Sequence, residues 1–215
     1  MARTSVTRLP EKASDDRDQL DQLLDSTMIG HIALVADSLP VVLPTAIARD
    51  GDRVLAHGST GSHWMRLLAA GAPVSLAVTA VDGLVVARSA FESSMHYRSA
   101  VLFGTFEPIR DTDGKVRALD VLTEALLPGR TAEVRRPTAK ELAATLVLAL
   151  PIDEWSVKIS AGWPDDPPED VDGPSWAGVV PLSTSAGTLQ QAPDLRPGIA
   201  VPPSVRRLSG ARGPG

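Results

Sequence analysis

The sequence predicts a mainly β domain, a small antiparallel barrel with a few helices packed at its ends. Runs rich in β-forming residues alternate with Gly, Pro and Asp turn signals along most of the chain, whereas only a few short segments have a helical period. Many short strands joined by hairpins, with few helices, favour this architecture. The 215 residues, 43% of them hydrophobic, suffice for one domain with a sizeable core and are marginal for two.

The first elements are a short amphipathic helix, three strands and a second short helix. Ser14 is a candidate N-cap for the first helix, in which Leu20, Leu23 and Leu24 recur at helical spacing. The second helix begins near Ser62 and stops at "GAP", because Gly and Pro end helices. Between the helices, the turns "DSLP" and "RDGD" separate segments rich in β-formers, and we expect strands at 29–36, 40–48 and 53–57.

The second half of the chain continues with strands around two more helical segments. The pair Asp82-Gly83 is the strongest short hairpin signal, so we expect it to join strands 73–81 and 84–89. Residues 111–127 carry an apolar face at helical period. The segment 140–152 begins with helical character and changes to strand character. Further strands are expected at 99–109 and 154–160, and residues 176–182 are again apolar after an acidic Pro/Gly loop.

Composition restricts the functional class. The formal net charge of −5 argues against nucleic acid and anionic membrane as partners, because both require clustered positive charge. The chain has no cysteine, which excludes disulfides, thiolate metal sites and cysteine nucleophiles and fits a cytoplasmic protein. The four histidines lack metal-ligand spacing, so no metal site is expected. We expect a flexible lead at 1–13, the domain at 14–183 and a Pro/Gly-rich tail, disordered or an extended arm, at 184–215.

The segment "HGSTGSHW" (57–64) has the composition of an anion site. Small and hydroxyl-bearing residues feed directly into a helix start, where unpaired amides and the helix dipole favour a phosphate. The same residues also fit a plain loop with a helix cap. Both interpretations remain open from this segment alone.

Four segments in order, "LPTAIA", "LAHGSTGSH", "HYRSAVLFGTFEPI" and "WAGVVPL", resemble the FMN-binding split-barrel proteins related to pyridoxamine 5′-phosphate oxidase. The likeness extends from about Leu20 to Leu182 and is greatest for the branch that includes nitroimidazole-resistance proteins. The resemblance implies a six-stranded antiparallel split β-barrel with peripheral helices. It also implies a homodimer that holds FMN in a groove between its subunits.

The resemblance assigns candidate cofactor contacts. The backbone at 44–46 would read the flavin ring, the turn at 57–64 would hold the phosphate, and Trp176 would pack close to the flavin. The family often has Arg or Lys where this chain has His63 and Trp64, so a protonated His63 or Arg66, one turn along, would supply the positive charge. The candidates are Pro44, Thr45, Ala46, His57, Ser59, Ser62, His63, Trp64, Arg98, Ser99 and Trp176.

The expected function is that of an FMN-dependent oxidoreductase acting on a small molecule. The flavin supplies the chemistry in such enzymes, so no nucleophile is needed and no catalytic residue is identified. Authentic pyridoxamine-phosphate oxidase activity is disfavoured. Those enzymes carry a basic cluster for the substrate phosphate near their C-terminal end, and "SVRRLSG" resembles it only weakly. The alternatives are a barrel that binds haem through His57, His63 or His96, one that stores flavin without catalysis, and a partner-binding dimer with a vacant groove.

Overall fold

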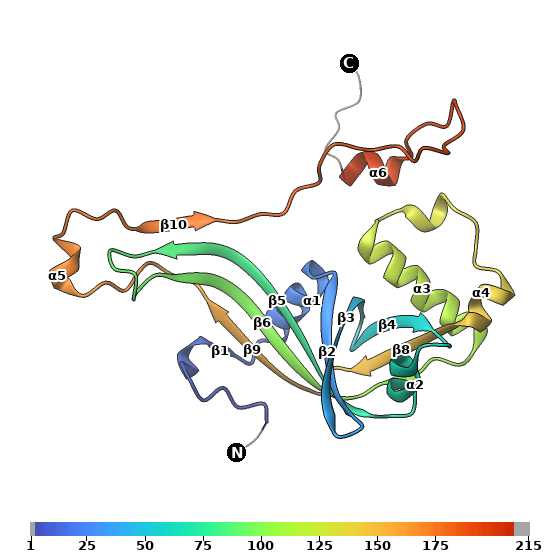
Figure 1. Ribbon diagram of the computed structural model, residues 1–215, viewed down its shortest axis with the longest axis horizontal. Helices are drawn as coiled ribbons and strands as arrows, with labels where there is room; N and C mark the ends of the chain where they lie inside the picture. Colours follow the sequence, from blue (N-terminus) through green and yellow to red (C-terminus); the bar gives the residue numbers. More distant parts are fainter. Residues whose placement is uncertain (1–2, 209–215) are drawn as a thin grey trace.

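The computed structural model describes residues 3–208, which contain an antiparallel sheet of ten strands (Figure 1). The strand order is β1-β9-β6-β5-β2-β3-β4-β8-β7, and β10 pairs with β5 beside this path. The order has two ends, β1 and β7, so the sheet curves without closing. The strands are β1 (Ala13–Ser14), β2 (Ile29–Ala36), β3 (Leu39–Asp50), β4 (Arg53–Ser59), β5 (Pro73–Val86), β6 (Ser94–Thr105), β7 (Glu107–Pro108), β8 (Thr145–Pro151), β9 (Glu154–Ser160) and β10 (Gly178–Pro181).

The structure confirms the antiparallel split barrel predicted from the sequence. It has more strands than the six expected, partly because the two-residue strands β1 and β7 are too short to leave a periodic signal. The expected change from helix to strand in 140–152 occurs at Thr145. Helices surround the sheet: α1 (Arg17–Ser26), α2 (His63–Ala69), α3 (Thr112–Leu126), α4 (Ala139–Ala144), α5 (Pro168–Val171) and α6 (Pro203–Leu208), with 3₁₀ turns η1 (Pro10–Lys12) and η2 (Arg130–Ala132).

The N-cap of α1 differs from the one predicted. Asp16 caps the helix, because its side chain accepts a hydrogen bond from the amide of Asp18 at 2.9 Å. Ser14 lies in β1, and its hydroxyl accepts a hydrogen bond from the amide of Asp16. Both residue types are good N-caps, so sequence preference could not choose between them.

Two apolar clusters lie on the two faces of the sheet. The larger cluster is inside the barrel, where Leu20, Leu23 and Leu24 of α1 are at most 2% exposed and pack against side chains from β2 to β9. Full burial of one such leucine contributes roughly 1.5–3 kcal/mol. On the other face, Ala118 and Leu122 of α3 pack over β3, β4 and β8. The two helices thus pack on opposite faces of the sheet that carries the candidate site.

The hairpin predicted at Asp82-Gly83 is wrong. Strand β5 runs through both residues without turning, and the register with β6 shifts between Val81 and Gly83, which is a bulge. The physical reason is long-range pairing. Strand β6 lies along one edge of β5, while β2 covers the first half of the other edge and β10 covers Gly83 to Val86. These neighbours keep the segment extended despite its turn preference.

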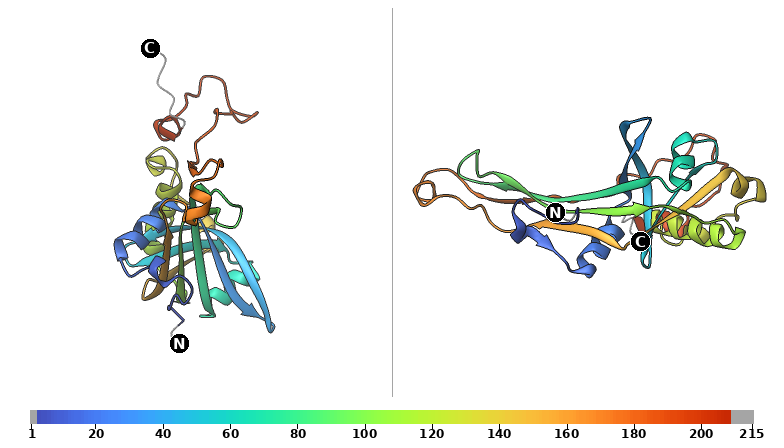
Figure 2. Two further views of the ribbon diagram at one scale, coloured as in Figure 1. Left: turned by 90° about the vertical axis from the view of Figure 1, so that its left-hand side faces the viewer. Right: turned by 90° about the horizontal axis from the view of Figure 1, so that it is seen from below.

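Strands β5, β6 and β10 extend away from the helices as a long arm, with α5 at its tip (Figures 1 and 2). After β10, residues 183–202 form no helix or strand and lead to α6. The start of α6 is held by Glu133, whose carboxylate accepts hydrogen bonds from the amide and hydroxyl of Ser204. Residues 1–2 and 209–215 of the expected terminal segments lie outside the described part. Within 3–208, no helix combines the length and apolar character that a membrane crossing requires.

Candidate functional site

The predicted backbone contacts lie on β3, in the middle of the sheet. Pro44 pairs with His31 of β2 and Ala46 pairs with Ile29, so these four side chains share one face of the sheet. His31, Ile29 and Pro44 are exposed on this face. It faces away from the main core, and we call it the open face. Further apolar side chains, those of Val35, Val42 and Val81, are exposed on β2, β3 and β5.

The glycine and hydroxyl turn follows β4 and is held by its own hydrogen bonds. The Ser59 hydroxyl accepts a hydrogen bond from the Gly61 amide at 3.1 Å, and the Ser62 hydroxyl accepts one from the Met65 amide at 3.4 Å. The Thr60 amide donates to the carbonyl of Ala144, which joins the turn to the start of β8. Ser62 is therefore a helix cap, as one of the two interpretations requires, and each serine hydroxyl retains a proton that it can donate outward.

Arg66 brings a positive charge to this turn. Its Nη1 donates to the carbonyls of Gly61 at 3.0 Å and Thr60 at 3.3 Å. Within residues 3–208, its Nε and Nη2 atoms have no hydrogen-bond partner, and the residue is exposed. Its guanidinium therefore lies at the turn with donors available to a ligand. The sequence analysis predicted Arg66 as one of two possible sources of positive charge at the phosphate. Arg66 lies near the turn because one turn of α2 separates it from Ser62.

The other candidates at this end lie around the turn. His63 is exposed and its ring meets that of half-buried Trp64 edge-on, with centroids 5.0 Å apart. Gly58 gives α2 its close approach to β4, since a Cβ there would lie 2.7 Å from Cγ of Met65. His57 is exposed, and partial desolvation lowers the pKa of its imidazole. The neutral form that this favours is the one that binds metals.

Arg98 and Ser99 lie on β6, which β5 and β2 separate from the candidate contacts on β3. Two N–H groups of Arg98 donate to the carboxylate of Asp82, each at 2.9 Å, and its Nη1 is 3.5 Å from the Ser26 hydroxyl. The ion pair lowers the pKa of Asp82 through these hydrogen bonds. Ser99 donates only a long bond, 3.5 Å, to the carbonyl of Lys158. Asp82 was not identified as a site residue, because its sequence neighbourhood signals a turn.

A cavity of about 680 Å³ lies at the junction of α1, β2, β5 and β6. His31, Asp82 and Arg98 line it together with the chain that follows β10 at Leu182 to Thr184. His31, which lines this cavity, pairs with Pro44 of β3 on the open face. His31 therefore lies between the cavity that contains Arg98 and the predicted contacts on β3.

Trp176 does not lie near the glycine turn in the same chain. It precedes β10 on the arm, is 66% exposed, and packs its ring edge against Gly178, where a Cβ would be 2.8 Å away. Because Gly178 pairs with Val86 at the far end of β5, Trp176 and α2 lie at opposite ends of the molecule (Figure 1). The candidate residues therefore form two groups, the residues around the glycine turn and Trp176 on the arm. One copy of the chain does not bring these two groups together.

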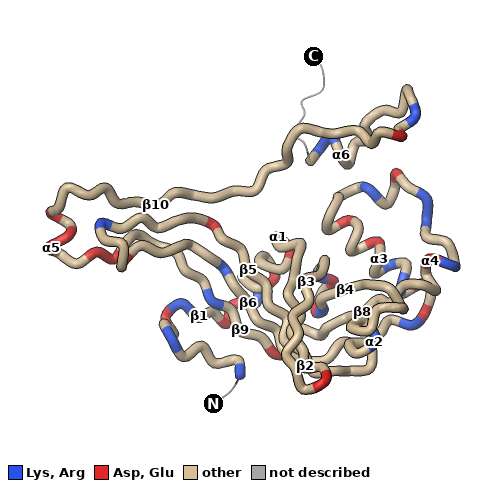
Figure 3. Tube along the Cα trace, in the orientation of Figure 1, with Lys and Arg blue, Asp and Glu red and all other residues tan. Residues whose placement is uncertain are grey.

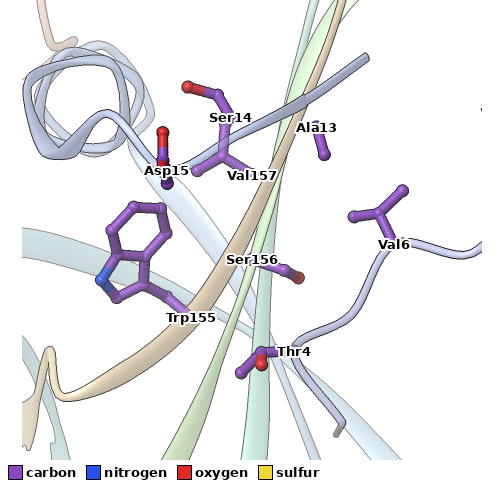
Figure 4. Close-up of a pocket in the computed structure, with 8 residues that line it drawn as sticks. All are labelled: Thr4, Val6, Ala13, Ser14, Asp15, Trp155, Ser156 and Val157. Carbon is purple, nitrogen blue, oxygen red and sulfur yellow. The ribbon is translucent and has the colours of Figure 1, made fainter. Parts of the chain in front are cut away.

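A second cavity, of about 510 Å³, contains none of the candidate residues. It lies between the N-terminal segment and β9 and is lined by Trp155, Ser156, Ser14, Asp15 and Thr4, among others (Figure 4). Among the lining residues that the structure describes, Asp15 is the one acidic side chain and none is basic. We therefore do not assign the candidate site to this cavity.

Comparison with known proteins identifies the family. The sequence profile of the family described as pyridoxamine 5′-phosphate oxidase matches residues 16–159, about two thirds of the chain. The chain therefore belongs to the pyridoxamine 5′-phosphate oxidase family, as the four segments predicted. No curated protein matches the sequence.

Solved structures give more specific similarities. The FAD and heme binding protein from Mycobacterium smegmatis is 56% identical, with a TM-score of 0.88 over 92% of this chain and 97% of that chain. The flavocytochrome Anf3 from Azotobacter vinelandii is 35% identical, with a TM-score of 0.89 over 97% of each chain. A Bacteroides thetaiotaomicron protein assigned to 5-nitroimidazole antibiotic resistance shares the fold alone, at 17% identity and a TM-score of 0.59 over 68% of this chain and 86% of that chain.

Proposed function

We propose that the protein is a homodimeric flavoprotein, an oxidoreductase acting on a small molecule, that holds its flavin on the open face between two copies. The observation that carries the proposal is the guanidinium of Arg66 at the serine-rich turn, with Nε and Nη2 available as donors. A charged donor beside two hydroxyls suits a phosphate. Family membership and the 56% identity to an FAD and heme binding protein support a flavin as the molecule that carries this phosphate.

The flavin is FAD in this proposal, although the family resemblance alone implies FMN. Both molecules carry the same ring system and a phosphate on the ribityl chain, so the residues of the turn fit either. The similarity to the M. smegmatis protein covers 92% of this chain, and that protein is described as binding FAD. Chromatography of the flavin released on denaturation distinguishes the two. Release of FMN would correct the choice of flavin and leave the site unchanged.

The chain's own residues bind and orient the cofactor. When bound, the flavin supplies hydride or electron transfer at its N5 atom. Arg66, Ser59 and Ser62 would hold the phosphate, and the backbone of β3 at Pro44, Thr45 and Ala46 would contact the polar edge of the ring. The exposed apolar side chains of the open face would exclude water once a second copy covers them.

Haem is the second cofactor that we propose, and His57 is its proposed ligand. Two similar proteins support haem, one described as a heme binding protein and the other as a flavocytochrome. Desolvation lowers the pKa of His57, which favours the neutral imidazole that acts as a ligand. The Nε2 atom of His96 is already 2.7 Å from the carbonyl of Gly162.

Binding experiments test both cofactors. Wild-type protein mixed with haemin should develop a Soret band that is lost in His57→Ala and kept in His96→Ala. Loss in His96→Ala alone would overturn the assignment of His57. Failure to retain flavin under saturating FAD and FMN would remove the flavoprotein proposal. The cytoplasmic location expected from the cysteine-free sequence also remains a proposal, which cell fractionation tests.

A further inference from the structure

The tip of the arm exposes three large aromatic side chains. Phe91 is 91% exposed, Trp163 is 81% exposed, and Trp176 is 66% exposed. Phe91 comes from the connection between β5 and β6, and the two tryptophans come from the connection between β9 and β10, one on each side of α5. We define the arm tip as residues 88–93 and 161–177. Exposed aromatic groups rimmed by polar residues are typical of protein interaction sites.

The arm tip is held in place by specific bonds. The side chain of Asp166 is only 1% exposed, and its carboxylate accepts hydrogen bonds from the amide of Arg88 at 2.8 Å and from its guanidinium at 2.9 Å. His96 contacts the carbonyl of Gly162, next to Trp163. A carboxylate buried in this way is costly to leave unpaired, so these bonds fix the loop that presents the aromatic groups. The arm tip is thus a surface of fixed conformation, and no part of the described chain covers it.

The arm tip is also strongly acidic. Residues 161–175 contain five acidic side chains and no basic one. Asp166 alone among them forms an ion pair within residues 3–208. The remaining acidic residues lie in α5 or within three residues of it, and Figure 3 shows α5 at the end of the arm. They are Asp165, Glu169, Asp170 and Asp172.

The opposite end of the molecule carries the complementary charge. Residues 130–140, from η2 to the start of α4, contain four basic side chains and one acidic side chain. We call this stretch the basic segment, and it is visible between α3 and α4 in Figure 3. Arg135, Arg136 and Lys140 are exposed, and the ion pairs of Arg135 and Arg136, to Glu141 and Asp120, lie at the surface. Surface ion pairs in general contribute little to stability, but the two hydrogen bonds of Arg135 to Glu141, at 2.6 and 2.8 Å, make that pair stronger than most, and the contact must offer Arg135 carboxylates in exchange.

We propose that the arm tip of each copy docks onto the basic segment of a second copy in a reciprocal contact. A two-fold axis perpendicular to the long axis of the molecule reverses that axis, so it brings the acidic tip of one copy to the basic end of the other. The inference rests on the homodimer of the proposed function. The contact carries Trp176 of one copy toward the end where the other copy holds its glycine turn, which joins the two groups of candidate residues.

Charge exchange between the two surfaces tests the contact. In one variant Glu169, Asp170 and Asp172 are changed to Arg, and in the other Arg135, Arg136 and Lys140 are changed to Glu. Each variant alone should dimerise at least tenfold more weakly than wild type, because like charges meet in both contacts. An equimolar mixture should recover a heterodimer, in which both contacts are again complementary. Sedimentation measures the affinities, and circular dichroism identifies any variant that fails to fold.

Cross-linking tests the geometry independently of the charge variants. Because the chain has no cysteine, Glu169→Cys and Arg135→Cys can be made as two separate chains, mixed, and treated with a bis-maleimide. We expect a covalent dimer between the two chains. The matched control replaces Arg135→Cys with Asp37→Cys, at the turn between β2 and β3, and should give little product.

The outcomes separate this inference from the homodimer itself. A wild-type protein that is monomeric at all concentrations would contradict the homodimer of the proposed function and the contact together. A wild-type dimer that both charge variants leave intact, or that cross-links equally through Asp37→Cys, would overturn the contact alone. Weakening by each variant with recovery in the mixture would support it.

Discussion

Arg98 and Asp82 form a bidentate ion pair at the bulge of β5, with both hydrogen bonds 2.9 Å long. Asp82 also accepts a hydrogen bond at its carbonyl from the amide of Leu182, where β10 ends. The pair therefore lies at the point where the edge of β5 changes partners from β2 to β10. It ties the base of the arm to the cavity that contains His31.

Removing this ion pair should loosen the arm more than it destabilises the domain. The side chains of Arg98 and Asp82 are 30% and 41% exposed, so solvent screening limits their coupling to about 0.5–1 kcal/mol. A double-mutant cycle with Asp82→Asn and Arg98→Gln, measured by urea unfolding, should give this value. Amide exchange should rise in β10 and not in β8. A coupling near zero with unchanged exchange would contradict the role in the arm.

Arg66→Gln should weaken flavin binding by about ten- to a hundredfold, because a charged hydrogen bond to phosphate contributes roughly 1.5–3 kcal/mol. Riboflavin, which lacks the phosphate, should bind both proteins equally. Arg53→Gln, at the other end of β4, is the matched control and should bind like wild type. Fluorescence titration measures all three affinities. An equal loss of riboflavin and FMN affinity would contradict a phosphate contact.

Gly30→Ala should destabilise the barrel by about 1–3 kcal/mol through overpacking. A Cβ at Gly30 would lie 2.7 Å from Leu76 and 3.1 Å from Ile47, both fully or nearly fully buried. Gly187→Ala is the control, since a Cβ there would meet nothing within 4 Å. Thermal and urea unfolding compare the two variants. A neutral Gly30→Ala would mean that β2 packs less tightly against β5 and β3 than described.

Acidification should release the start of α4. Hydrogen bonds from Arg135 and Thr138 lower the pKa of Glu141 to about 2. A carboxyl whose pKa is depressed by folding stabilises the folded form above its unfolded pKa of about 4.5, and this contribution is lost as the pH falls through about 2. Amide protection in α4 should therefore decline over this window. Glu141→Gln should remove the pH dependence, and an unchanged profile in that variant would contradict it.

Local patterns predicted the elements whose packing agrees with their periodicity. The three leucines of α1 and the change of structure within 140–152 are examples, because burial and propensity favour the same conformation there. The pair Asp82-Gly83 shows the limit, since pairing with β6 and β10 overrides its turn preference. No local signal indicated that pairing, because the partners of Gly83 are His96 and Pro181, which lie far along the chain.

The candidate site was predicted less completely. Ser62 and the turn were identified from composition, and Arg66 was a recognised alternative because it lies one helical turn away. The partnership of Arg98 with Asp82 was missed, since it depends on the register of a bulge. The separation of Trp176 from the turn was also missed. A family resemblance gives the order of the motifs along one chain. It does not indicate which copy in a dimer contributes each motif to a given site.

The absorbance spectrum of the purified protein, before and after addition of FAD, FMN and haemin, tests the cofactor proposal most directly. Denaturation then identifies whatever is released. We expect a protein-bound flavin spectrum, release of FAD, and a Soret band with haemin that depends on His57. A protein that retains no flavin and whose thermal stability is unchanged by FAD or FMN would contradict the proposed function, because a tight ligand must raise stability.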